Sequence, residues 1–143
     1  MTVKAILAAK GGDVVTVEPA ANLVTAAKLL AERRIGSLVV LGPDSRIAGI
    51  LSERDIVRAF ATQGAAALEA PIAEVMTRKV VICNEAETIS GVMERMTTGK
   101  FRHVPVIEHG RLLGIVSIGD VVKYRLEEME REAAALRTYI LTA

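Results

Sequence analysis

Apolar and polar positions follow two periods along this chain, and the alternation between the periods predicts its secondary structure. A short apolar run at 14–17 fits a strand, and the apolar positions that come next have helical spacing. Asn22, a residue type that caps helices, precedes them. Two further apolar runs flank the turn-forming sequence 42–45 and predict paired strands. A second helix is expected from Ser52. The helical positions are Leu23, Ala26, Ala27 and Leu30.

The same order of elements occurs a second time. The run 80–83 matches 14–17 at an offset of 66 residues, and Thr88 takes the capping place of Asn22. The block 49–57 then matches 114–122 at an offset of 65. The corresponding helical positions are Ile89, Val92, Met93 and Met96, and the corresponding turn is Glu108-His109-Gly110. The pattern β-α-β-β-α, present twice, predicts a mixed α/β (α+β) fold made of tandem repeats.

The repeats also predict how the chain is organised. Two small halves that each carry an apolar sheet face are expected to pack about a pseudo-two-fold axis, as one module over 1–143. We expect a first repeat at 3–62, an alanine-rich linker at 63–71, a second repeat at 72–125 and a C-terminal helix at 126–143. Short lead-in helices are expected at 3–7 and 72–76.

Composition narrows the class of protein. Half of the residues are hydrophobic (51%), but the chain has two Phe, two Tyr and no Trp, so its core must be aliphatic. Eighteen basic residues balance seventeen acidic ones, which argues against general nucleic-acid binding. No apolar run approaches the ~20 residues of a membrane helix, and no signal peptide is evident. With Cys83 as its one cysteine, the chain is expected to be cytoplasmic.

Each second helix opens with the motif Ser-x-x-Asp, as Ser52-Glu53-Arg54-Asp55 and as Ser117-Ile118-Gly119-Asp120. One interpretation is a helix cap alone, in which Ser and Asp satisfy the first backbone N–H groups. The other adds a ligand, because a helix start attracts phosphate and a carboxylate can accept both hydroxyls of a ribose. Both interpretations are compatible with the motif.

The doubled order of strand, helix, paired strands and Gly-x-x-Ser-x-x-Asp resembles the CBS-domain family, whose tandem pairs are called Bateman modules. The resemblance covers about 3–125 and implies a regulatory module, without enzymatic activity, metal or required cofactor. It implies an adenine nucleotide (AMP, ADP, ATP or NAD) bound in the cleft between the repeats, a homodimer, and a regulated partner that the sequence does not identify. Neither nucleic acid nor membrane is an expected partner.

The resemblance also implies two unequal ligand sites. The site built on Asp55 would comprise Ser52, Arg54, Gly36, Ser37, Phe101, Thr77 and the backbone of Val81, with Arg54 facing the phosphate. The site built on Asp120 would comprise Ser117, Gly119, Arg102, His103, Ile35, Lys10 and the backbone of Val15, with Arg102, His103 or Lys10 facing the phosphate. The plainer alternatives are solvated strand-end side chains for Arg102 and His103 and an exposed first-turn side chain for Arg54. Cys83 is expected to be a small buried hydrophobe.

The C-terminal helix carries a heptad-like pattern. No Gly or Pro occurs after Val121, and the apolar positions fall at intervals of four and three residues: Val122, Leu126, Met129, Ala133, Leu136 and Ile140. This helix either folds back on its own module or packs on a second copy of the chain. An interaction protein that binds no nucleotide is therefore the alternative to the ligand sensor.

Overall fold

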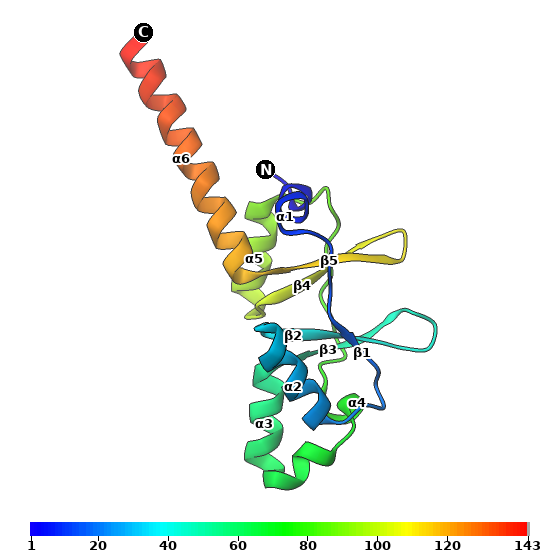
Figure 1. The fold of residues 1–143 in the computed structure, drawn as a ribbon. Coiled ribbons are helices and arrows are strands. Elements are labelled where there is room, and N and C mark those ends of the chain that lie inside the picture. The colour runs from blue at the N-terminus through cyan, green and yellow to red at the C-terminus, as the bar shows by residue number, and fades with distance from the viewer. Residues whose placement is uncertain (143) are drawn as a thin grey trace. The chain divides into compact units, whose positions relative to one another are not determined.

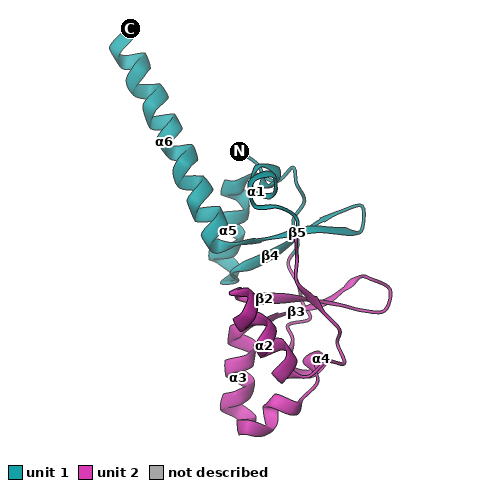
Figure 2. Ribbon diagram, viewed as in Figure 1, with its two compact units in different colours: residues 1–12, 82–143 teal, residues 13–81 magenta. Residues whose placement is uncertain are grey.

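The computed structural model describes residues 1–142, and its chain divides into two units (Figure 2). Unit 2 is the continuous segment 13–81, whereas unit 1 combines residues 1–12 with the chain from residue 82 onward. The two units therefore do not coincide with the two sequence repeats. The first twelve residues belong to the unit that contains the second repeat, and residues 72–81 belong to the unit that contains the first.

Unit 2 is built on a three-stranded sheet in the order β1-β2-β3 (Figure 1). Strand β1 pairs parallel to β2, and β2 pairs antiparallel to β3. Its core draws aliphatic side chains from the sheet, from the helices and from the 3-10 helix. The elements are β1 (Thr16–Val17), α2 (Leu23–Arg33), β2 (Ser37–Leu41), β3 (Ile47–Ser52), α3 (Glu53–Gln63), the 3-10 helix Gly64–Glu69 and α4 (Ile72–Val75).

Unit 1 is built on the antiparallel pair β4-β5, in which His103 lies opposite Ser117. The hairpin turn places His109 and Gly110 at positive φ (51° and 75°), which is the geometry of the tight turns that suit hairpins. The elements are α1 (Val3–Lys10), α5 (Ile89–Gly99), β4 (His103–Glu108), β5 (Arg111–Ser117) and α6 (Ile118–Thr142). The order β-α-β-β-α predicted from the sequence is thus confirmed in both repeats except at the first strand of the second.

Local capping chemistry fixes where the helices begin. The Asn22 side chain accepts a hydrogen bond from the Thr25 amide, and the Thr88 hydroxyl accepts one from the Gly91 amide, each at 3.0 Å. These contacts satisfy backbone donors that have no partner inside the helix. Both predicted caps are confirmed.

Two expected elements differ from the structure. The strand expected at 80–83 is wrong for most of its length, because only Cys83 bridges a strand, pairing with Val106. Residues 80–82 belong to no strand, and the boundary between unit 2 and unit 1 falls between residues 81 and 82. The segment expected as a linker at 63–71 contains a 3-10 helix whose Ala67 is fully buried in the core of unit 2.

Glycine at equivalent positions lets each lead-in segment approach its sheet. A Cβ on Gly49 would lie 2.7 Å from the carbonyl oxygen of Thr77, and a Cβ on Gly114 would lie 2.6 Å from the Leu7 side chain. Both distances are shorter than real Cβ atoms tolerate. Gly49 is therefore required by packing against the backbone of the lead-in segment, whereas Gly114 meets only the end of a side chain that can rotate.

Candidate functional site

Asp55 lies at the start of α3 in a complete capping box. One of its oxygens, Oδ2, accepts hydrogen bonds from the Ser52 amide at 2.9 Å and from the Ser52 hydroxyl at 3.2 Å. The Asp55 amide in turn donates to Ser52 Oγ at 3.3 Å. Asp55 is 5% exposed. The cap interpretation of the motif is therefore correct for this copy, whether or not a ligand also uses the carboxylate.

Thr77 completes the surroundings of this carboxylate. Its hydroxyl donates to Asp55 Oδ1 at 3.2 Å, and its backbone is tied to Ile50 by two hydrogen bonds of 2.8 and 2.9 Å. Arg58, one helical turn after Asp55, places a guanidinium nitrogen 3.6 Å from Oδ1. Both oxygens of Asp55 thus have partners within unit 2.

Asp120 occupies the equivalent place at the start of α6. Its Oδ2 accepts a hydrogen bond from the Ser117 amide at 2.9 Å, and its own amide donates to Ser117 Oγ at 3.2 Å. The remaining partner is Lys10, whose Nζ lies 2.7 Å from Oδ2 and also donates to the carbonyl oxygen of Ile115 at 2.8 Å. Lys10 comes from the end of α1, so the lead-in segment supplies the contact here, as Thr77 does in unit 2.

The environment of Asp120 favours its ionised form. Burial alone would raise the pKa of Asp120, but hydrogen bonds from Lys10 and Ser117 and the charge of Lys10 outweigh burial, so the pKa lies below its ordinary value. The Asp120 side chain is 24% exposed and the Lys10 side chain 35%. This ion pair is therefore open to water, unlike the carboxylate of Asp55.

The strands beside the two carboxylates correspond residue by residue. The Glu53 amide donates to the carbonyl of Gly36 at 3.0 Å, and the Ile118 amide donates to that of Arg102 at 2.8 Å. Ser37 lies opposite Ser52 in the sheet, just as His103 lies opposite Ser117. The structure thus places Gly36 and Ser37 beside the Asp55 motif, and Arg102 and His103 beside the Asp120 motif.

Comparison with known protein families agrees with this doubled arrangement. The model of the CBS domain matches residues 3–62 and 72–127. The chain belongs to the CBS-domain family. The fold class predicted from the sequence is likewise confirmed by the likeness to solved CBS-domain pairs.

Three solved CBS-domain structures illustrate the likeness. A CBS-domain protein of Agrobacterium tumefaciens is 51% identical, with a TM-score of 0.84 over 87% of this chain and 92% of that one. A CBS-domain protein of Pyrobaculum aerophilum, complexed with AMP, is 27% identical (TM-score 0.75; 84% and 89% covered). The CBS-domain pair of the protein MJ0100, complexed with 5′-methylthioadenosine and S-adenosyl-L-methionine, is also 27% identical (TM-score 0.79; 90% and 98% covered).

The first three curated relatives are up to several times longer than the matched region. The chain spans 68%, 58% and 22% of their lengths. For most of them, the shared part is thus the CBS pair and not the whole protein.

The CBS helix starts offer an anion few backbone donors. In α3 the Glu53 and Asp55 amides are already bonded, and in α6 the Ile118 and Asp120 amides are bonded in the same way. Any phosphate at these helix starts would therefore have to be met mainly by side chains.

The expected phosphate contacts differ in their surroundings. Arg54 and Arg102 are exposed and take part in no side-chain hydrogen bond or ion pair within residues 1–142. Lys10 is engaged with Asp120. Gly119 is exposed and its Cβ position is open, with only Ser117 Oγ near, at 3.6 Å. The structure thus leaves space beside Gly119, and its part in a ligand site stays a prediction.

Four expected ligand residues stand apart from the clusters described. Phe101 belongs to unit 1, whereas Asp55 belongs to unit 2; Val15 and Ile35 belong to unit 2, whereas Asp120 belongs to unit 1. Val81 shares unit 2 with Asp55 and is half-buried. Their part in a ligand site stays a prediction.

Arg58 is the residue that the sequence interpretation missed. It follows Asp55 at a spacing of three residues, which places both side chains on one helix face. That spacing is the signal that identifies it. The second repeat has Lys123 at the equivalent place, and this side chain lies over the Tyr124 ring, 5.5 Å from its centroid.

Other chemistry is limited among the residues described. Burial raises the pKa of Cys83 to about 12, and Glu87 adds to the rise. The thiol therefore stays protonated and uncharged, as expected of a small buried hydrophobic residue. Residues 1–142 contain no cluster of His, Cys, Asp and Glu able to hold a metal ion. None of the helices described combines the length and apolar character needed to cross a bilayer.

Proposed function

We propose that this chain is a regulatory module whose two CBS repeats together bind an adenine nucleotide and transmit the bound state to a partner protein, without catalysing a reaction. The observation that carries the proposal is the pair of capped carboxylates, Asp55 and Asp120, in equivalent places of a CBS pair. Related CBS pairs hold adenosine compounds, namely AMP, 5′-methylthioadenosine and S-adenosyl-L-methionine. The ligand of this chain would be AMP, ADP, ATP or NAD.

The Asp120 motif is the better candidate for the first ligand. Its carboxylate is partly exposed, and the partner that it would exchange for a ribose is an exposed amine. Such an exposed ion pair contributes about 0–1 kcal/mol, so replacing it costs little. Released Lys10 would then stand beside the ligand as a cation for its phosphate, together with Arg102 and His103.

The Asp55 motif would bind more weakly. A ribose that approached this carboxylate would have to displace Thr77 or share Oδ1 with it, at a site only 5% exposed. Thr77 itself is exposed, so its displaced hydroxyl can bond to water, and the obstacle to the ribose is the burial of the Asp55 carboxylate. Arg54 would meet the phosphate here, with Gly36, Ser37 and Ser52 beside the ribose.

Calorimetric titration with AMP tests the proposal. We expect Asp120→Asn to weaken binding by about 10- to 100-fold, because it removes charged hydrogen bonds worth roughly 1.5–3 kcal/mol. Asp44→Asn is the matched control, since it removes the same charge from a turn and can keep its bond to the Arg46 amide. Equal affinities in Asp120→Asn, Asp55→Asn and the control would refute the nucleotide site.

Lys10→Met tests the part assigned to the amine. If Lys10 moves from Asp120 to the phosphate, the variant loses affinity for AMP but not for adenosine. The ratio of its affinity for AMP to its affinity for adenosine then falls. Tighter binding of both compounds by the variant would instead show that Lys10 only competes with the ribose. The assay is again calorimetry, with circular dichroism to check that the variant folds.

An interaction protein that binds no nucleotide is the second candidate. The exposed apolar side chains of α6 favour it, including Leu126, Leu136 and Ile140 at 57–64% exposure. A thermal-shift screen over adenine, guanine and dinucleotide ligands separates the two, because a ligand at 100 times its Kd adds about 2.7 kcal/mol to the folded state. No shift with any ligand favours the second candidate.

A further inference from the structure

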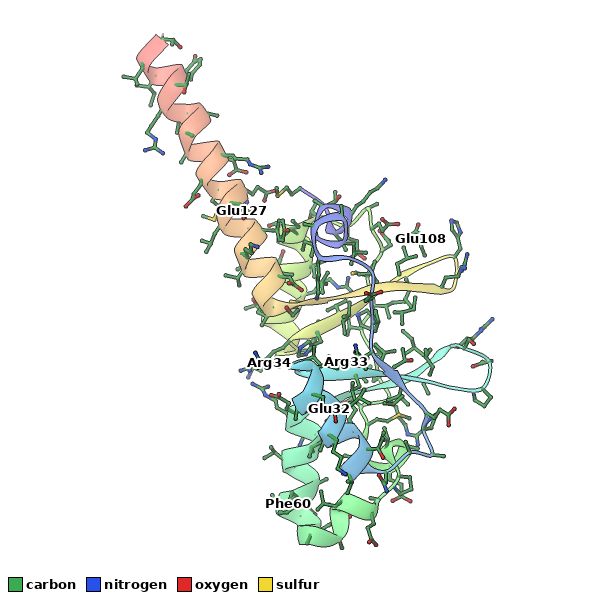
Figure 3. All side chains as sticks on the ribbon, in the orientation of Figure 1. Glu32, Arg33, Arg34, Phe60, Glu108 and Glu127 are labelled. Atoms are coloured by element: carbon green, nitrogen blue, oxygen red, sulfur yellow. The ribbon has the colours of Figure 1, made fainter. Side chains whose placement is uncertain are left out.

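Helix α6 carries a row of apolar side chains that its own unit leaves uncovered. The helix runs from Ile118 to Thr142, and every residue described after Glu128 is exposed. Figure 3 shows the side chains of its last turns standing clear of every other element of unit 1. These turns therefore do not fold back on unit 1. We call the following residues the seam: Val122, Leu126, Met129, Ala133, Leu136 and Ile140.

The seam has the spacing of a coiled coil. Its residues alternate at intervals of four and three, which places Leu126, Ala133 and Ile140 at a positions and the other three at d positions. The exposed fractions at Met129 and Leu136 are 49% and 59%. A contiguous apolar stripe of this kind in water marks an interaction surface.

We propose that the seam packs against the seam of a second copy of this chain, as a parallel and in-register two-stranded coiled coil. The proposal is independent of the nucleotide function. The charges that flank the seam favour a second copy of the chain as the partner and the parallel orientation of the two helices.

In a parallel pair, each g position faces the e position five residues further along the other helix. Glu132 at g then faces Arg137 of the second copy, and Arg125 at g faces Glu130 of the second copy. Two-fold symmetry doubles both contacts, so all four flanking pairs join opposite charges. Arg125 already contacts Glu128 in its own chain at 2.5 Å, whereas Glu132 lies 3.7 Å from Arg125 and is 65% exposed, so the orientation rests chiefly on Glu132 and Arg137.

In an antiparallel pair that matches all six seam positions, e faces e and g faces g. Glu130 then meets Glu130, Glu132 meets Glu132, and Lys123 meets Arg137 of the second copy. Every one of these contacts joins like charges. Sliding the antiparallel helices by one heptad brings opposite charges together but leaves two of the six seam positions unpaired. The parallel arrangement alone satisfies the apolar row and the charges together.

The first experiment measures the mass of the full chain in solution by light scattering during size exclusion. The unaltered chain is expected to be a dimer, and Leu136→Glu is expected to be a monomer because it places two carboxylates inside the seam. Leu141→Glu is the matched control, since Leu141 is 85% exposed and lies off the seam. A monomeric unaltered chain, or a dimer that survives Leu136→Glu, would overturn the proposal.

Charge reversal tests the orientation. Glu132→Arg and Arg137→Glu should each weaken the dimer about tenfold, because each turns two attractions into two repulsions. The double variant restores opposite charges in the parallel pair and should regain the original affinity. Arg131→Glu is the control, because residue 131 faces away from the seam. Stronger dimerisation of Arg137→Glu alone would indicate the antiparallel pair, in which this residue faces Lys123.

A cysteine placed in the seam provides an independent readout. In the parallel pair residue 136 faces residue 136, so oxidised Leu136→Cys is expected to run as a covalent dimer on a non-reducing gel. Leu141→Cys is not expected to do so, and native Cys83 is buried and does not interfere. Absence of the covalent species from Leu136→Cys in a sample that is dimeric by mass would refute the parallel register.

Discussion

Alanine at the two motif glycines should destabilise the protein by different amounts, although the glycines occupy equivalent places. At Gly49 a Cβ would lie 2.7 Å from both the Met76 sulfur and the Thr77 carbonyl oxygen. At Gly114 its close contact is the end of the Leu7 side chain at 2.6 Å, and the nearest backbone atom, in Gly12, is 3.6 Å away. A side-chain end can rotate, but a backbone carbonyl that belongs to a hydrogen-bonded bridge cannot.

The magnitudes follow from that difference. Forcing extra volume into a packed site costs typically about 1–3 kcal/mol, and replacing glycine returns roughly 0.4–1 kcal/mol by restricting the unfolded chain. Gly49→Ala should therefore lower the free energy of unfolding by about 1–2 kcal/mol, and Gly114→Ala by less than about 1 kcal/mol. Urea unfolding followed by circular dichroism measures both.

A comparison of the two Ser-x-x-Asp motifs in Gly49→Ala separates a local packing effect from a general loss of stability. Thr77 holds Asp55 through its hydroxyl, so moving its backbone should also alter the Asp55 motif and leave the Asp120 motif intact. Gly64→Ala is unsuitable as a control because Gly64 has a φ of +66°. Gly119→Ala is suitable, since its Cβ position is open. Equal costs for Gly49→Ala and Gly114→Ala would refute the reasoning from backbone rigidity.

Three further outcomes are expected. Asp55→Asn should lower stability by about 2–3 kcal/mol and Asp120→Asn by about 1 kcal/mol in urea unfolding, because only the first carboxylate is buried with hydrogen bonds to both oxygens. The pKa of Asp120 is depressed, so its contribution is complete above the ordinary value of 3.8 and is lost as pH falls through the lower folded value. Unfolding at successive pH values should therefore show the gap between the unaltered chain and Asp120→Asn closing in that acid range, and a gap that persists would contradict the assignment. Cys83, with its pKa raised to about 12, should resist a thiol reagent at pH 8 in the folded protein and react at once in urea; rapid labelling of the folded chain would contradict its burial.

The sequence was sufficient for features that depend on neighbouring residues. Asn22, Thr88, Ser52 and Ser117 all cap the helices predicted for them, because a cap is decided within four residues. The repeat itself was visible because both copies need the same glycine, serine and aspartate. The aliphatic core follows from composition, and all of the largest fully buried side chains are aliphatic or Met.

Features that depend on distant segments were not predictable from spacing. Nothing local indicates that residues 1–12 join the unit of the second repeat, or that Thr77 joins the unit of the first. Lys10 was one of three residues expected at the phosphate of the Asp120 site, and its direct bond to Asp120 requires the end of α1 to lie beside α6. The prediction of a strand at 80–83 was wrong for the same reason, since its apolar pattern does not indicate where the chain passes from one unit to the other.

The two carboxylates differ in a way that bears on the charge of the ligand. A ribose that takes Asp120 from Lys10 leaves that amine without its counter-ion. The released positive charge is best balanced by an anion on the ligand itself, because opposite charges attract at short range. A phosphate supplies that anion, whereas the sulfonium of S-adenosyl-L-methionine brings a further positive charge. On this argument the Asp120 motif should discriminate against S-adenosyl-L-methionine and in favour of AMP, and the preference should weaken as added salt screens the exposed charges.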